Sequence, residues 1–135
     1  MSAAETAAAP AKWMRLLGWG LTVLVSLFLA MDAAMKFMDL PQVQAATGQL
    51  GWPTKLDRLV GVIELACLVL YAFPRTAVLG AVLLTGLLGG AIASHVRVGD
   101  PLFSHVLFGV YVGLMAWGGL YLRDEKLRAL IPLRR

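Results

Sequence analysis

The chain has 135 residues, of which 59% are hydrophobic and 15% are charged, and its mean hydropathy is +0.76. Soluble domains carry about a quarter charged residues, so this composition predicts a single integral membrane domain. The formal net charge is +4, but the basic residues flank apolar runs and no nucleic-acid motif is present, so the charge indicates orientation and contact with anionic lipid rather than a nucleic-acid partner.

The first element in chain order is an alanine-rich segment, residues 1–12, which we expect to be a mobile cytoplasmic tail. Four apolar segments follow, each close to the roughly 20 helical residues that cross a bilayer, and prolines separate them. The pattern predicts an all-α fold, an antiparallel four-helix transmembrane bundle over residues 13–123. The predicted spans are 14–38, 54–73, 76–96 and 102–122.

The distribution of lysine and arginine predicts the orientation of these spans. If both termini lie on one side of the membrane, that side receives Lys12, Arg15, Arg75, Arg123, Lys126, Arg128, Arg134 and Arg135. The other side receives Lys36, Lys55, Arg58 and Arg97. The positive-inside rule therefore places both termini in the cytoplasm. Residues 124–135 form a basic cytoplasmic tail, which is either a short amphipathic helix on the inner leaflet or a solvated end.

Small residues predict close packing of the third and fourth spans. In the third span they recur every four residues, and in the fourth Gly109 and Gly113 have the same spacing. Because small residues allow membrane helices to approach closely, this pattern predicts a tight antiparallel pair, either inside one bundle or against a second protomer. The small residues of the third span are Ala81, Thr85, Gly89 and Ala93, with Gly86 and Gly90 beside them.

Ionisable residues inside membrane spans are costly and usually face a cavity or a partner. Asp32 and Lys36 lie one helical turn apart near the end of the first span, where they could pair with each other. Glu64 lies about 15 Å into the second span and has no partner on its own helix. It is therefore either a functional group facing a pocket or a protonated carboxyl group that is hydrogen-bonded to a neighbouring helix.

Further polar residues surround the connection between the third and fourth spans, which carries His95, Arg97, Asp100 and His105. Asp100 precedes Pro101 and is a plausible cap for the fourth helix. An antiparallel bundle brings these residues to the outer level of Asp32 and Lys36, above Glu64. The layer is either the polar cover of a ligand pocket or an ordinary interfacial charge ring. The separation of the two histidines matches no metal-ligand signature, so no bound metal is expected.

Long stretches of the sequence resemble the DoxX-like family of small bacterial membrane proteins. The most specific are "GVIEL", "FPRTAVLGAVLLTGLLGGAIASHVRVGDPLFSH" and "WGGLYLRDEKLRALIP", within a similarity over about residues 24–134. The resemblance implies four transmembrane helices and a multi-pass location in the bacterial inner membrane. The wider DoxX/DoxD grouping includes a subunit of a thiosulfate:quinone oxidoreductase, but it supplies no established catalytic residue. Thiol–disulfide exchange within one chain is excluded, because the chain has one cysteine, Cys67, which we expect to be a small buried hydrophobic residue.

Three functions are compatible with these features. The first is an accessory module of a membrane redox or envelope-stress system that binds a small lipophilic molecule, a quinone or a lipid. The second is a scaffold or assembly factor that contacts a redox partner or a second copy of the chain. The third is an intramembrane enzyme in which Glu64 and a histidine transfer protons. The ligand-binding hypothesis involves Asp32, Lys36, Glu64, His95, Arg97 and His105.

Overall fold

The structure is a computed structural model that describes residues 3–130, with the side chains of residues 12–130. It is all-α. Four helices pack in a closed cycle, in which α1 contacts α5 and α3, α3 contacts α4, and α4 contacts α5. Their bounds are Ala3–Phe37 for α1, Asp57–Ala72 for α3, Ala77–Arg97 for α4 and Phe108–Arg123 for α5.

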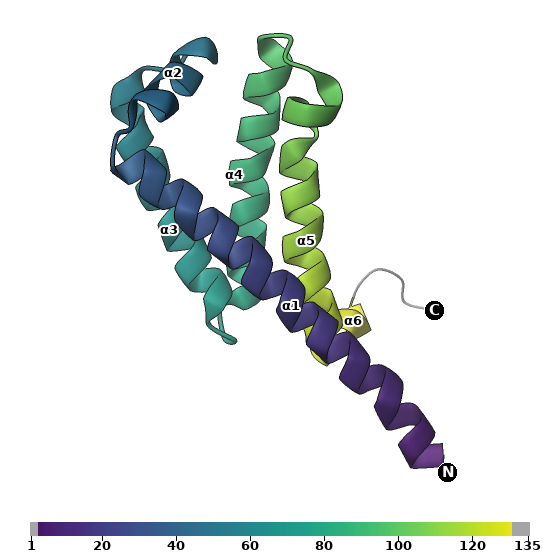
Figure 1. Ribbon diagram of the computed structural model, residues 1–135. Helices are drawn as coiled ribbons and strands as arrows, with labels where there is room; N and C mark the ends of the chain where they lie inside the picture. The colour runs from purple at the N-terminus through teal and green to yellow at the C-terminus, as the bar shows by residue number, and fades with distance from the viewer. Residues whose placement is uncertain (1–2, 131–135) are drawn as a thin grey trace.

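Figure 1 shows α1 lying diagonally across the other helices, with its C-terminal half against α3 and its N-terminal half running past the end of α5. The connections 38–56 and 98–107 lie at the same end of the molecule, which we name the loop end. The short helix α6 (Glu125–Leu130) and the turn between α3 and α4 lie at the opposite end, which we name the α6 end.

Three segments are long and apolar enough to cross a membrane: Lys12–Phe37, Ala77–Arg97 and Leu102–Arg123. They coincide with the first, third and fourth predicted spans. The second predicted span, 54–73, is helical but interrupted: the 3-10 helix η1 (Thr54–Leu56) leads into α3, which has 16 residues. The helix α3 is shorter than the other three segments, and it does not qualify as a candidate span by length and composition.

Two further differences from the predicted elements have simple causes. The helix α1 begins at Ala3 and thus includes most of the segment expected as a tail, consistent with the high helix propensity of alanine. A short helix that the apolar pattern does not predict, α2 (Pro41–Gln49), follows α1 at the loop end. Pro41 stops α1 but begins α2, because proline fits the first turn of a helix. Residues 131–135 of the predicted basic tail lie outside the described residues.

Glycines in the helix interfaces explain how closely the helices approach. Gly119 of α5 faces α1 so closely that an added Cβ would lie 2.7 Å from Thr22 Oγ1 and 3.0 Å from the carbonyl oxygen of Gly18. At the other side of the cycle, a Cβ on Gly109 would lie 2.8 Å from a side-chain carbon of Ile92 in α4. The predicted pairing of α4 with α5 is therefore present. The glycines of the α1–α5 interface were not predicted.

Candidate functional site

An ion-pair cluster joins α1 to α3 near the loop end, and we name it the Lys36 cluster after its central residue. Lys36 Nζ donates hydrogen bonds to Asp32 on its own helix and to Glu64 Oε2 on α3, the latter at 2.7 Å. The side chain of Glu64 is only 2% exposed, whereas those of Lys36 and Asp32 are 24% and 38% exposed. The cluster therefore extends from the packed interior to the surface of the bundle.

A glycine makes this contact between helices possible. Gly61 lies one turn before Glu64, and a Cβ at that position would lie 3.1 Å from the carbonyl oxygen of Ala33 and 3.2 Å from Lys36 Cβ. A larger residue at Gly61 would push α3 away from α1. The Lys36 cluster therefore depends both on the three charged residues and on the glycine that lets their helices approach.

The charges of the cluster do not balance. Two carboxylates share one ammonium, so the fully ionised cluster has a net charge of −1. A lysine ammonium has three N–H donors, and two of them are used by Asp32 and Glu64. Within the part of the chain that the structure describes, no acceptor is found for the third N–H. The exposed side of Lys36 can therefore donate a hydrogen bond to an oxygen atom from outside the protein.

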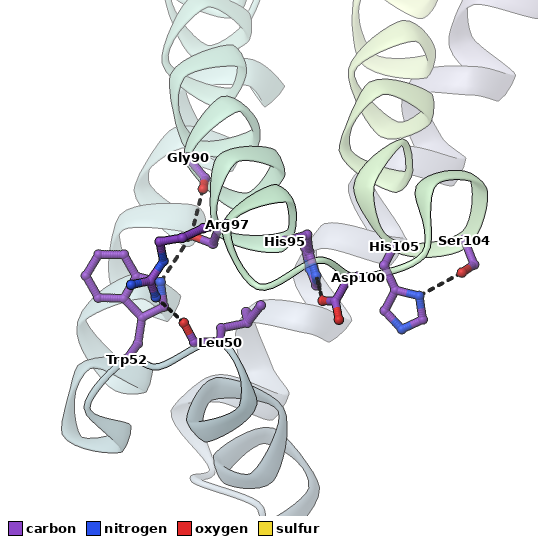
Figure 2. A network of polar contacts seen from close by, with 9 residues as sticks. Leu50, Trp52, Gly90, His95, Arg97, Asp100, Ser104 and His105 are labelled. Atoms are coloured by element: carbon purple, nitrogen blue, oxygen red, sulfur yellow. Dashed lines mark hydrogen bonds and ion pairs between the residues drawn. The ribbon is translucent and has the colours of Figure 1, made fainter.

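The histidines form a separate network at the end of α4. Figure 2 shows His95 beside Asp100, with His95 Nδ1 2.5 Å from Asp100 Oδ2. The rings of His95 and His105 meet edge to face, with centroids 5.7 Å apart, and His105 Nδ1 lies 2.7 Å from Ser104 Oγ. Asp100 thus binds a histidine instead of capping the following helix, which begins as a π-helical turn, η2 (Leu102–Val106), after Pro101.

Arg97 belongs to a third group of contacts, also drawn in Figure 2. Its guanidinium donates a hydrogen bond to the carbonyl oxygen of Leu50 and lies 5.8 Å from the centre of the Trp52 ring. The indole N–H of Trp52 donates to Ser94 Oγ at 3.1 Å, and Ser94 in turn donates to the carbonyl oxygen of Gly90 at 2.9 Å. These contacts fasten the connection after α2 to the end of α4.

The six predicted site residues therefore fall into three groups. The structure brings Asp32, Lys36 and Glu64 together, and it pairs His95 with His105. Arg97 is engaged with a loop backbone. No hydrogen bond or ion pair among residues 3–130 connects the Lys36 cluster to the histidines, so the single layer expected from the sequence is divided. Glu64, which has no partner on its own helix, is bound by Lys36 of α1.

Sequence reasoning missed a polar contact at the α6 end. Arg123 Nε donates to Thr22 Oγ1 at 3.1 Å, and Thr22 donates to the carbonyl oxygen of Gly18 at 2.8 Å. The Arg123 guanidinium also lies 4.4 Å from the centre of the Trp19 ring, a distance typical of a cation–π contact. The four-residue spacing of Gly18 and Thr22 was the available signal, since small residues at this spacing mark membrane helix interfaces.

An open apolar groove is also found at the α6 end, far from Glu64 along the bundle. It has a volume of about 380 Å³ and lies between α5 and α6. No group of three or more metal-ligating side chains occurs among the described residues. The groove is lined by Leu114, Trp117, Gly118, Tyr121 and Leu127.

The apolar helices, their exposed hydrophobic surfaces and the charges buried between them define an integral, multi-pass membrane protein built from α-helices. Residues 20–119 match the DoxX-like family, and the chain belongs to that family. No curated protein and no solved structure matches the chain.

Proposed function

We propose that this DoxX-like protein binds a small amphiphilic molecule, a quinone or a lipid, at the Lys36 cluster. The main support for this proposal is the position of Lys36. Two carboxylates hold its ammonium group, while one N–H and part of its surface stay open to the surroundings. A quinone carbonyl or a lipid ester oxygen can accept that hydrogen bond. In an apolar environment such a bond is worth more than in water, because water does not compete for it.

Methionines beside the cluster support the same proposal. Met31 and Met35 lie one turn apart on α1, next to Asp32 and Lys36 in the chain, and Met38 directly follows the helix. Met31 is 55% exposed and Met38 is 67% exposed. Methionine side chains are flexible and polarisable, and they adapt to ligands of irregular shape. In this proposal the ligand's apolar tail lies along the methionines while its polar group meets Lys36.

The proposed role is that of an accessory module in a membrane redox or envelope-stress system. The ligand would supply any electron chemistry, and the protein would hold its polar group at a defined depth. Asp32 and Glu64 orient Lys36, and the histidine and Arg97 groups keep the loop end folded above it. This division of roles assigns ligand contact to Lys36 and positioning to the two carboxylates.

We further propose that α3 is a fourth membrane crossing and that both termini are cytoplasmic. The path of the chain supports a fourth crossing: α1 ends at the loop end, α4 begins at the α6 end, and α3 runs between them (Figure 1). The 16 residues of α3 and the three of η1 extend about 30 Å together, the thickness of a hydrocarbon core. The excess of basic residues at the α6 end supports the orientation.

The ligand proposal is tested with purified protein in nanodiscs and two probes, ubiquinone-2 and phosphatidylethanolamine. Binding is compared between wild type, Lys36→Met and the matched control Lys55→Met, which removes an exposed lysine at the loop end. We expect at least one probe to bind wild type and Lys55→Met equally and Lys36→Met about tenfold more weakly, as for one lost charge-assisted hydrogen bond. Equal binding by all three proteins, or binding of neither probe, would overturn the proposal.

A scaffold role is the second candidate, and one observation favours it. Gly86, Gly89 and Gly90 lie on the exposed surface of α4, and a Cβ at each would meet nothing within 4 Å. A helix from another protein could approach this face closely. If Gly90→Leu abolishes a stable complex seen by native mass spectrometry, while Lys36→Met leaves that complex intact, the scaffold role is supported over ligand binding.

A further inference from the structure

The groove at the α6 end lies where a membrane span leaves the bilayer. Its lining comes from the last turns of the span Leu102–Arg123 and from Leu127 in α6. Leu127 is only 4% exposed and packs into the hydrophobic core, so it fixes α6 against α5. The groove therefore begins at the depth of lipid acyl chains and ends beside a helix at the level of lipid head groups.

The walls of the groove offer carbon surface rather than hydrogen bonds. The indole N–H of Trp117 already donates to Thr85 Oγ1 at 2.7 Å, and the carbonyl oxygen of Tyr121 already accepts a hydrogen bond from Arg128 Nη1 at 2.9 Å. Leu114 is 67% exposed at the open side of the groove. A hydrocarbon chain fits such a surface because it needs no polar partners.

The rim of the groove is positively charged. Arg128 Nη1 donates hydrogen bonds to the carbonyl oxygens of Tyr121 and Leu122 at the C-terminal end of α5. The other guanidinium nitrogen atoms of Arg128 make no hydrogen bond within residues 3–130. Lys126, two residues earlier on α6, is exposed. Glu125 is also exposed on α6, but it forms no ion pair with either cation in that described range. Asp124 is occupied, because its Oδ1 accepts the backbone N–H groups of Lys126 and Leu127.

We propose that this groove binds an anionic phospholipid, with one acyl chain along Trp117 and Tyr121 and the phosphate at Arg128 and Lys126. Charge complementarity selects the anionic head group, and the apolar groove beside it selects a molecule that also has a hydrocarbon chain. A free phosphate ion would use only the rim. The site lies at the opposite end of the bundle from the Lys36 cluster and does not depend on it.

Glycine positions provide a matched pair of variants for the test. A Cβ on Gly118, which lines the groove, would meet only Leu21 Cδ1 at 3.8 Å, so Gly118→Leu places a side chain there without a backbone clash. Gly20 lies on exposed α1 at a similar depth, and a Cβ there would meet nothing within 4 Å. Gly20→Leu is therefore the control for membrane-exposed bulk. Arg75→Gln, in the turn between α3 and α4, is the control for lost positive charge.

The measurement is native mass spectrometry of detergent-purified protein titrated with phosphatidylglycerol or phosphatidylcholine of identical chains. We expect wild type to bind one phosphatidylglycerol at least tenfold more tightly than phosphatidylcholine. Gly118→Leu should weaken the binding of both lipids at least fivefold. Lys126→Gln and Arg128→Gln should each reduce the preference for phosphatidylglycerol over phosphatidylcholine to less than threefold. Because Arg128 also caps α5, Lys126→Gln tests the charge requirement without loss of a structural contact. Gly20→Leu and Arg75→Gln should match wild type.

Several outcomes would overturn the proposal. They are equal binding of the two lipids by wild type, the same loss of preference in Arg75→Gln, and unchanged binding by Gly118→Leu. Inorganic phosphate that competes as well as phosphatidylglycerol would also overturn it, because the groove would then have no part in binding. If native mass spectrometry instead shows a dimer that Gly118→Leu abolishes, the groove binds a second copy of the chain and not a lipid, and the proposal is overturned.

Discussion

Lys36 Nζ lies 2.7 Å from Glu64 Oε2, and this contact joins α1 to α3 across the interior of the bundle. The two residues are separated by 28 positions in the chain, and Glu64 is almost fully buried. A buried carboxylate without its partner is strongly unfavourable, so the contact both stabilises the interface and holds the lysine in place. Structure and proposed ligand binding therefore depend on the same atoms and must be separated by experiment.

The first prediction separates them through stability. Lys36→Met should lower the free energy of unfolding in mixed micelles by about 2–4 kcal/mol, because it leaves Glu64 buried without its cation. The double variant Lys36→Met, Glu64→Gln should recover at least half of that loss, since the stranded charge is gone. Asp32→Asn should cost less than about 1 kcal/mol, because Asp32 is partly exposed. A double variant no more stable than Lys36→Met would contradict the role assigned to Glu64.

The second prediction concerns the α1–α5 interface. Gly119→Ala should destabilise the protein by about 1–3 kcal/mol, since its Cβ would overlap Thr22 and the backbone of Gly18, neither of which can move freely. Gly20→Ala is the matched control, because that position is open and alanine has the higher helix propensity. Thermal unfolding in detergent should show a lower Tm for Gly119→Ala and an equal or higher Tm for Gly20→Ala. The opposite order would mean that the two helices do not pack as described.

The third prediction concerns the loop end. Arg97→Gln removes the hydrogen bond to the Leu50 carbonyl and the contact with Trp52. We expect amide hydrogen exchange in residues 47–52 to become about fivefold faster, which corresponds to a loss of about 1 kcal/mol in local stability. Exchange in the middle of α4 should not change. Lys55→Gln, at an exposed lysine nearby, should behave as wild type, and faster exchange in that variant would show that the effect is not specific to Arg97.

Much of the fold was predictable because it follows from hydropathy. The apolar runs identified α1, α4 and α5 and located their last residues closely, although α1 begins earlier than predicted, at Ala3, and α5 begins later, at Phe108. The prolines located the breaks. The second span was harder to classify, because it begins with η1 and its charged residues lower its hydropathy. These are Lys55, Asp57, Arg58 and Glu64. The short helix α2 has no buried residue and lacks an apolar face, so hydropathy carried no signal for it.

One contact of the Lys36 cluster was predictable from the sequence, and the other was not. Spacing along one helix correctly paired Asp32 with Lys36. The partner of Glu64 depends on which residues of α1 face α3. Those residues follow from the inclination of α1 across the bundle (Figure 1), which hydropathy and spacing do not predict. For the same reason the histidines were expected in one layer with Asp32 and Lys36, above Glu64, although His95 is held by Asp100 at the end of α4. The inclination follows from close contacts at Gly61 and Gly119, which become visible only when both partner helices are known.

The fourth prediction tests the number of crossings through the side from which introduced cysteines can be labelled. In a Cys67→Ala background, Gly48→Cys lies on α2 and Val98→Cys at the end of α4, both exposed at the loop end, whereas Arg75→Cys lies in the turn at the opposite end. If α3 crosses the membrane, a membrane-impermeant maleimide added to intact cells should label Gly48→Cys and Val98→Cys. It should label Arg75→Cys only after the cells are opened, because the positive-inside rule places that turn in the cytoplasm. Cys67 itself is buried, so the wild-type protein should remain unlabelled and serves as the control. Labelling of Gly48→Cys and Arg75→Cys from the same side would show that α3 does not cross, and labelling of Arg75→Cys alone in intact cells would reverse the proposed orientation.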